Sequence, residues 1–165
     1  MSEISYRYMC EADIPAVWEL ERRCFTLPWS RKAIGDDLKN PFTRYVVAAD
    51  RGTIVGYGGM WIIVDEAHIT NIAVDEVYRR GGIGTGILLR LAKAALAKRV
   101  FSMTLEVRVS NGAAIALYSG LGFEKYGIRK GYYGDNQEDA IIMWNERLQE
   151  LAFTEPLEIA AAPGI

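Results

Sequence analysis

Cysteine and histidine are scarce in this sequence. Among 165 residues there are two cysteines, Cys10 and Cys24, and a single histidine, His68. The cysteines show no C-x-x-C spacing, and a structural zinc site requires several Cys or His ligands. The composition therefore predicts no bound metal, and it predicts that both thiols stay reduced.

A strong excess of charge and a long apolar run are also absent. The formal net charge is -2, so binding of nucleic acid through bulk electrostatics is not expected. The longest apolar run, Met60 to Val64, is far shorter than the ~20 residues that span a bilayer. Residues 1–7 lack the apolar core and cleavage site of a signal peptide. We therefore expect a cytoplasmic protein with neither a membrane nor a nucleic-acid partner.

The length and the 50% share of hydrophobic residues predict one domain with a real core. Strand and helix patterns occupy residues 1–150, whereas residues 151–165 contain two prolines and an alanine run without a clear period. We expect this tail to be poorly ordered or to dock a partner.

Periodicity predicts an alternating order of strands and helices. Asp13 and Ser30 are predicted to cap the first two helices, and Leu27-Pro28-Trp29 separates them. Regular alternation would place His68 on the same face as Thr70 and Ile72. The predicted strands cover 4–8, 45–49, 54–64, 67–74, 103–109, 123–129 and 138–147, and the later helices cover 83–99 and 111–120.

The most informative motif is Arg79-Arg80-Gly81-Gly82-Ile83-Gly84-Thr85-Gly86, between a predicted strand and a predicted helix. Glycines allow several backbone N–H groups to converge, the helix start adds its positive dipole end, and two arginines add charge. The segment therefore predicts a pyrophosphate-binding loop, with a plain connecting loop as the alternative.

Two other phosphate motifs fit less well. A P-loop requires Gly-Lys-Ser/Thr, which does not occur. In a dinucleotide-binding fingerprint the third glycine would stand where Ile87 lies, although Glu106 follows about twenty residues later, where a ribose-binding acid is expected. That fold stays open as an alternative.

The spacing Arg79-x-x-Gly82-x-Gly84 resembles the motif by which the GNAT acetyltransferases hold acetyl-coenzyme A. With the order of elements, the resemblance covers residues 3 to 148 and is closest to the RimI-type N-terminal (α-amino) protein acetyltransferases. It implies an α/β (α+β) GNAT domain over 1–150, with a mixed central β-sheet flanked by about four helices. The matching segments are Phe25-x-x-Pro28-Trp29-Ser30, Asp65-Glu66-Ala67, Asn71-Ile72-Ala73-Val74, Leu105-Glu106-Val107-Arg108-x-Ser110-Asn111, Ala114-Ile115-Ala116-Leu117-Tyr118, Leu121-Gly122-Phe123, Tyr132-Tyr133 and Glu138-Asp139-Ala140.

The resemblance implies acetyl-CoA as cosubstrate and a set of residues that bind it. In the family, a strand offers backbone groups to the pantetheine arm, and the glycine loop holds the pyrophosphate. Asn111 is an implied coenzyme contact as well as a candidate helix cap. The implied coenzyme-binding residues are Ile72, Ala73, Val74, Arg79, Arg80, Gly81, Gly82, Ile83, Gly84, Thr85 and Asn111.

Glu106 and Tyr118 are the candidate catalytic residues. Glu106 interrupts an apolar strand, where glutamate is disfavoured, so it faces either solvent or a cleft. The matching glutamate of the family is a general base acting through water, and the matching tyrosine protonates the departing thiolate. Without the resemblance, Tyr118 would be interpreted as core packing, and His68 stays open as a participant or a groove residue.

Energetics favour an α-amine as acceptor. At neutral pH, deprotonating an α-amine costs roughly 1 kcal/mol, against roughly 4–5 kcal/mol for a lysine. Two segments resemble the loops that flank the peptide groove in the family, although their aromatics could also be ordinary rim residues: Leu27, Pro28 and Trp29, and Tyr132 and Tyr133.

We therefore expect a monomer or weak dimer that acetylates a protein N-terminus, with a ribosomal protein beginning with Ala or Ser as the candidate. Three alternatives stay open: an acetyltransferase for a small amine such as a polyamine or aminoglycoside, a lysine acetyltransferase, and a coenzyme-binding module without turnover.

Overall fold

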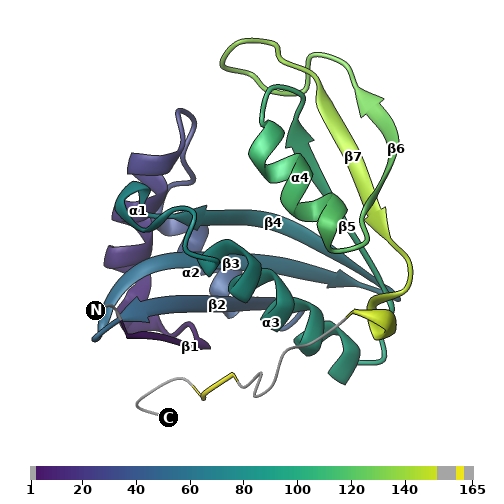
Figure 1. The fold of residues 1–165 in the computed structure, drawn as a ribbon. Coiled ribbons are helices and arrows are strands. Elements are labelled where there is room, and N and C mark those ends of the chain that lie inside the picture. Colours follow the sequence, from purple (N-terminus) through teal and green to yellow (C-terminus); the bar gives the residue numbers. More distant parts are fainter. Residues whose placement is uncertain (1–2, 152–158, 162–165) are drawn as a thin grey trace.

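The computed structural model describes residues 3–151 and 159–161, and its centre is one seven-stranded sheet (Figure 1). The strand order is β1-β2-β3-β4-β5-β7-β6; β4 pairs with β5 in parallel and the other neighbours pair antiparallel. The expectation of a mixed sheet is confirmed, and the mostly parallel sheet of a dinucleotide-binding fold is excluded. The strands are β1 (Ile4–Tyr8), β2 (Thr43–Asp50), β3 (Thr53–Ile63), β4 (Glu66–Val74), β5 (Ser102–Arg108), β6 (Glu124–Arg129) and β7 (Ala140–Asn145).

Four α-helices in the described residues cover the two faces of the sheet (Figure 1). Helices α1 (Ile14–Cys24) and α2 (Arg31–Lys39) lie on one face, and α3 (Ile83–Ala97) and α4 (Gly112–Gly120) lie on the other. Each face has its own core, because apolar residues of the central strands alternate between the two sides.

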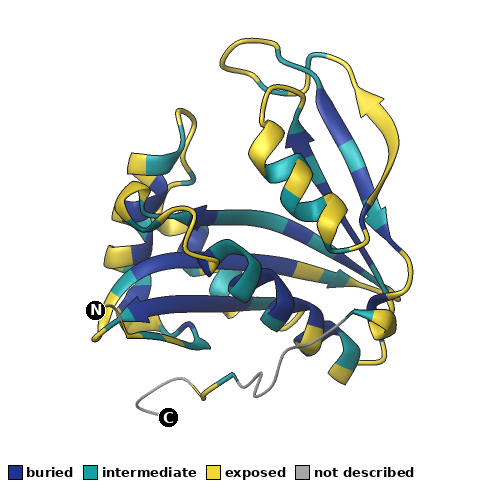
Figure 2. Cartoon of the chain, in the orientation of Figure 1, coloured by how far each residue is buried: buried dark blue, intermediate teal, exposed yellow. Residues whose placement is uncertain are grey.

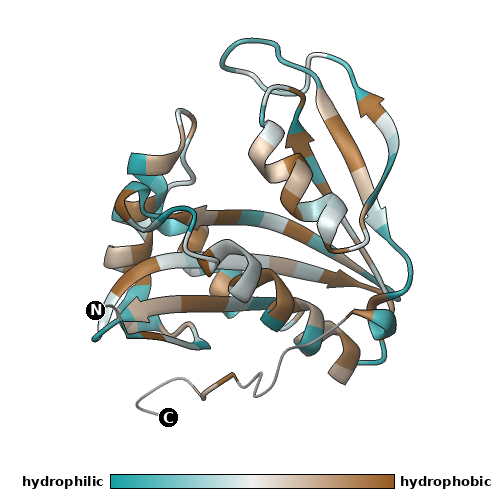
Figure 3. Cartoon of the chain, viewed as in Figure 1, coloured by the Kyte–Doolittle hydropathy of each residue, from teal (hydrophilic) through white to brown (hydrophobic). Residues whose placement is uncertain are grey.

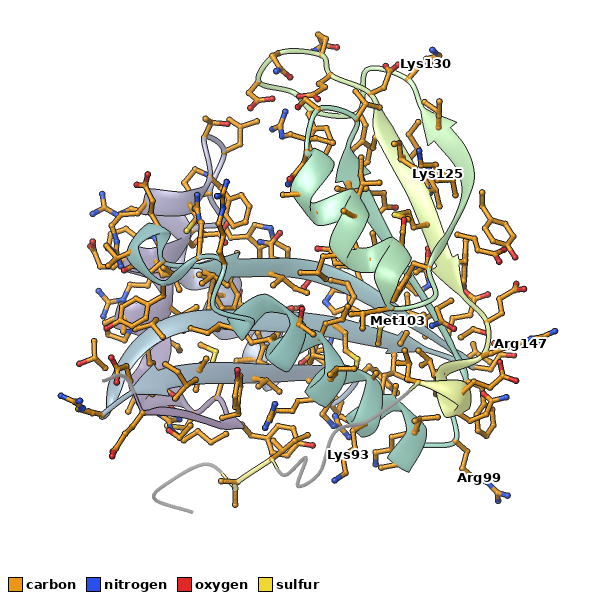
Figure 4. All side chains as sticks on the ribbon, in the orientation of Figure 1. Lys93, Arg99, Met103, Lys125, Lys130 and Arg147 are labelled. Carbon is orange, nitrogen blue, oxygen red and sulfur yellow. The ribbon has the colours of Figure 1, made fainter. Side chains whose placement is uncertain are left out.

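Burial follows the position of each strand in the sheet. The central strands are largely buried and hydrophobic, whereas every residue of the edge strand β6 is exposed (Figures 2 and 3). In Figure 4, Lys130 projects outward at this end of the molecule. Burial is therefore greatest in the interior strands of the sheet and least at β6.

Strand β4 contains a bulge at Thr70. Asn71 is opposite Gly59 and Ile69 is opposite Met60, so Thr70 is an extra residue without a partner in this pairing. An extra residue reverses the side-chain alternation beyond it. Ile69 and Ile72 both pack in the core that contains α3, and the expectation that His68 shares a face with Ile72 is therefore wrong.

Strands β4 and β5 separate beyond His68 and Thr104, just before this bulge. They pair only where Glu66–His68 lies beside 102–104, and Figure 1 shows the two strands diverging from there. Met103, buried and labelled in Figure 4, lies in the segment that is still paired. The divergence opens the middle of the sheet between two strands that carry predicted site residues.

Two of the three predicted helix caps are confirmed. The Ser30 side chain accepts a hydrogen bond from the Ala33 N–H, and the Asn111 side chain accepts one from the Ala114 N–H. Asp13 precedes α1, but its carboxylate does not cap that helix. It pairs with Arg7 at 2.6 Å and accepts the Cys10 N–H, because a charged partner on β1 outcompetes a helix N–H.

A short part of the C-terminal tail lies along β1. The Tyr8 N–H donates to the Ala160 carbonyl at 3.0 Å, and the Ala160 N–H donates to the Tyr6 carbonyl at 3.3 Å. Most of residues 151–165 lies outside the described residues, so the expected lack of order of this tail stays a prediction. Within the described ranges, no helix combines the length and apolarity that crossing a membrane requires.

Candidate active site

A cleft of about 500 Å³ lies where β4 and β5 separate. Its lining brings together predicted residues that are far apart in the sequence: Leu27, Trp29, Ile72, Glu106, Asn111, Tyr118, Tyr132 and Tyr133. Pro28, Ala73, Val74 and the 79–85 loop are not among the described residues that line it. Ala73 is buried in the core that contains α1, so only its backbone could serve a ligand between the strands.

Glu106 lies in the cleft on β5, opposite Ile142 of β7. Its side chain is 27% exposed, and its Oε1 lies 3.4 Å from the Nε of Arg129 on β6. The sequence left two orientations open for Glu106, toward solvent or into a cleft, and in the structure its side chain lies in the cleft. A partly exposed carboxylate that lines a cleft can accept a proton from a ligand or through water.

Tyr118 approaches the same cleft from α4. Its ring packs against Phe123, with the ring centroids 6.0 Å apart, and burial raises the pKa of its phenol to about 12. A phenol with this pKa keeps its proton at neutral pH. It is therefore suited to donate a proton rather than to accept one.

The two tyrosines of the β6–β7 loop are held by their neighbours. Tyr132 and Tyr133 meet edge to face with centroids 5.0 Å apart, and the Arg108 guanidinium lies 3.9 Å from the Tyr133 centroid. Arg108 also bonds Asp135 at 2.8 Å and Glu138 at 3.2 Å. Burial raises the pKa of Tyr133 to about 12, so this phenol is also protonated at neutral pH.

The α1–α2 loop touches the β6–β7 loop across the cleft. The Thr26 hydroxyl donates to the Asp135 carboxylate, and Leu27 Cδ1 lies 3.6 Å from where a Cβ on Gly134 would stand. Sequence reasoning missed Thr26, Arg108 and Asp135. Arg108 lies within a segment matched to the family, but its partners follow only from the fold.

Glu21 is a further cleft residue that sequence reasoning missed. It is buried on α1, and its carboxylate accepts hydrogen bonds from the Trp29 N–H, the Asn71 amide and the Tyr57 hydroxyl. Burial raises the pKa of this carboxyl group, against the effect of its three donors. The available signal was a glutamate four residues after Val17 on the apolar face of a helix.

The glycine loop forms the start of α3. Gly82 stands at the helix N-cap with φ +81°, and the Gly86 N–H makes the first helical bond, to the Gly82 carbonyl at 2.9 Å. The N–H groups of residues 83–85 precede that bond and point toward the N-terminal end, where an anion is favoured. Arg79 donates from Nε to the Val74 carbonyl at 3.0 Å, which ties the loop to β4.

No group of three or more His, Cys, Asp or Glu side chains that could hold a metal ion occurs in residues 3–151 and 159–161. Cys10 and Cys24 are both free thiols. The arrangement thus offers a carboxylate and a protonated phenol in a cleft between two loops that carry aromatic side chains.

Comparison with known proteins identifies the family. The family model described as acetyltransferase (GNAT) family matches residues 14–123. The ribosomal protein bS18-alanine N-acetyltransferase of Escherichia coli K12 is 38% identical over 133 residues, which cover 79% of this chain and 89% of that protein. The N-alpha-acetyltransferase RimI of Mycobacterium tuberculosis is 36% identical over 141 residues, which cover 82% and 87%.

A solved structure shows the same fold. The crystal structure of the ribosomal-protein-S18-alanine N-acetyltransferase from Escherichia coli superposes with a TM-score of 0.82 and 33% identity, covering 95% of this chain and 100% of that chain. The family match spans more than half of the sequence, and it includes the glycine loop and both candidate catalytic residues. The chain therefore belongs to the GNAT family of acetyltransferases.

Proposed function

We propose that this protein transfers the acetyl group of acetyl-CoA to the N-terminal α-amino group of a protein. The main support for the proposal is that Glu106 and Tyr118 both line the cleft between β4 and β5. Relatives named for alanine N-acetylation of ribosomal protein bS18 make a ribosomal protein beginning with Ala or Ser the leading acceptor. The enzyme would act in the cytoplasm as a monomer or weak dimer.

The coenzyme is assigned to the start of α3 and to β4. Residues 79–85 supply backbone N–H groups and positive charge for the pyrophosphate. The pantetheine arm lies along Ile72, Ala73 and Val74, where the departure of β5 leaves this part of β4 free to pair with it. Asn111, which lines the cleft and caps α4, supplies a further contact.

The reaction needs three proton movements, and one C–N bond forms while one C–S bond breaks. Glu106, through water, takes a proton from the acceptor ammonium, and the free amine attacks the thioester carbonyl. A backbone N–H of β4 stabilises the oxyanion, an interaction worth roughly 3 kcal/mol. Collapse of the intermediate breaks the C–S bond, and Tyr118 donates its proton to the thiolate. The nitrogen then loses its second proton through water to the Tyr118 phenolate, which leaves a neutral amide, a free thiol and a protonated Tyr118.

The geometry supports a peptide acceptor over a small polycation. The carboxylates of Glu21 and Glu106 both line the cleft, but the first is saturated by three donors and the second pairs with Arg129. Such a cleft offers little unbalanced negative charge to a polyamine. Two contacting loops rich in aromatic side chains suit an extended peptide end instead.

Peptide acetylation tests the proposal. The protein is incubated with acetyl-CoA and short peptides that differ in residue one, each also supplied with a blocked N-terminus and a free lysine. We expect product only on free N-termini, strongest with Ala or Ser first. Equal labelling of the blocked lysine peptides, or turnover of polyamines without any peptide product, would refute it.

A further inference from the structure

Glu21 is a buried carboxylate in the wall of the cleft that the proposed proton transfers do not use. It lies on α1, only 1% exposed, on the face of the helix that packs against the sheet. Its side chain also forms part of the cleft lining. A charged group in this position is unusual, because acidic residues are rarely fully buried unless they are paired.

Three elements converge on this carboxylate. The Trp29 N–H of the α1–α2 loop donates to Oε2 at 2.9 Å, and the Asn71 amide of β4 donates to Oε1 at 3.1 Å. The Tyr57 hydroxyl of β3 donates to Oε1 as well. Glu21 therefore connects the loop that carries Leu27 and Trp29 to the residue that follows the Thr70 bulge.

Fold stability alone does not require an acid here. Taking a carboxylate out of water is costly, and apolar residues of similar volume often stabilise a protein as well or better. What an apolar residue cannot do is accept the loop N–H. Without that acceptor, the loop would lose the hydrogen bond that joins Trp29 to α1.

We propose that Glu21 is a positioning residue that holds the α1–α2 loop at a set distance from β4 and thereby shapes the subsite for the acceptor's first residue. The inference rests on the proposed function, because it takes the cleft to hold a peptide N-terminus. Glu106 and Tyr118 approach from β5 and α4 on the other side of the cleft. A shift of Trp29 therefore changes how the acceptor amine is aimed at them.

The test compares Glu21→Met with Glu21→Gln. Methionine keeps the volume of the side chain and removes both acceptor oxygens. Glutamine keeps one oxygen to accept the Trp29 N–H. The Asn71 amide and the Tyr57 hydroxyl can each rotate to accept the N–H groups of the glutamine. With an alanine-initiated peptide at saturating acetyl-CoA, we expect Glu21→Met to raise the acceptor KM about ten- to hundredfold. Glu21→Gln should return the KM to within about threefold of wild type.

Glu19→Gln is the matched control. Glu19 lies on the same helix, half exposed, in an ion pair with Arg22. Its variant should keep the wild-type KM. Calorimetry with acetyl-CoA should show coenzyme affinity within about twofold of wild type for all three variants.

An unchanged acceptor KM in Glu21→Met would overturn the inference. A loss of acetyl-CoA affinity in Glu21→Met as large as its rise in acceptor KM would overturn it as well. If Glu21→Met fails to fold, Asn71→Leu is tested in its place, because it removes the hydrogen bond between the Glu21 carboxylate and β4. A raised acceptor KM in Asn71→Leu supports the inference, and a wild-type acceptor KM refutes it. A wild-type protein that acetylates only small amines would instead refute the proposed function.

Discussion

The two candidate catalytic side chains lie in different environments, and each environment fits its proposed role. Tyr118 is buried, and its pKa of about 12 keeps the phenol protonated. Glu106 is partly exposed and has a cationic neighbour at 3.4 Å, in Arg129. The buried phenol is thus suited to donate a proton, and the carboxylate lies where a proton acceptor is needed.

Replacing either group should slow the chemical step. We expect Tyr118→Phe and Glu106→Gln each to lower kcat by about 10²- to 10⁴-fold while leaving coenzyme affinity within about twofold. Steady-state kinetics and calorimetry measure the two quantities. Tyr126→Phe is the matched control, because it removes an exposed phenol on β6 that bonds Glu146. Wild-type rates in both active-site variants would show that water alone carries the protons.

Residues differ in how far their roles can be predicted from sequence. Glu106 stands out because it breaks an apolar strand, and the structure places it in the cleft. Thr26 and Asp135 gave no such signal, because their hydrogen bond joins loops more than a hundred residues apart. Contacts of that kind depend on how the sheet brings the loops together.

At the scale of elements, the start of α3 depends on one backbone conformation. Gly82 has φ +81°, and a Cβ at this position would meet no heavy atom within 4 Å. The free-energy cost of a side chain at this position therefore comes only from the left-handed backbone conformation, and it is about 1–2 kcal/mol. Gly52, in the β2–β3 turn, has φ +87° and the same open surroundings.

The two glycines form a matched pair for testing the coenzyme loop. We expect Gly82→Ala and Gly52→Ala to lose similar stability, about 1–2 kcal/mol, measured by urea denaturation. Only Gly82→Ala should weaken acetyl-CoA binding, by about tenfold or more, because only it shifts the N–H groups at the helix start. Equal coenzyme affinity in the two variants would contradict the assignment of residues 79–85.

Element positions were largely predictable, and the bulge in β4 was not. The predicted strands and helices coincide with the observed ones to within a few residues, because apolar periodicity reflects burial. The bulge at Thr70 depends on the pairing of β4 with β3. It alters which side chains share a face without altering the sequence pattern, and so the expectation for His68 failed.

At the scale of the whole molecule, buried phenols make stability depend on alkaline pH. Burial raises the pKa of Tyr118 to about 12, and burial is also the main cause of the raised pKa values of Tyr45 and Tyr57. A phenol whose pKa is higher in the folded than in the unfolded state stabilises the fold fully below the unfolded value, near 10. That contribution is lost as pH rises toward the folded value.

We therefore expect the melting temperature to fall steadily above pH 10. Tyr118 alone accounts for about 2 kcal/mol of lost stability by pH 12. Circular dichroism melts between pH 8 and pH 12 measure the effect, and Tyr118→Phe should show a shallower decline than wild type. A decline of the same steepness in Tyr118→Phe would show that its phenol is not as buried as the structure indicates.

The sequence by itself determined the order of elements, the glycine loop and the identity of the residues that carry the family resemblance, because these depend on local spacing and periodicity. Only the tertiary structure decided that β4 and β5 separate beyond His68 and Thr104, that two distant loops touch through Thr26 and Asp135, and that Glu21 faces three donors. Each of these depends on strand register and on contacts between distant segments, which local patterns do not encode.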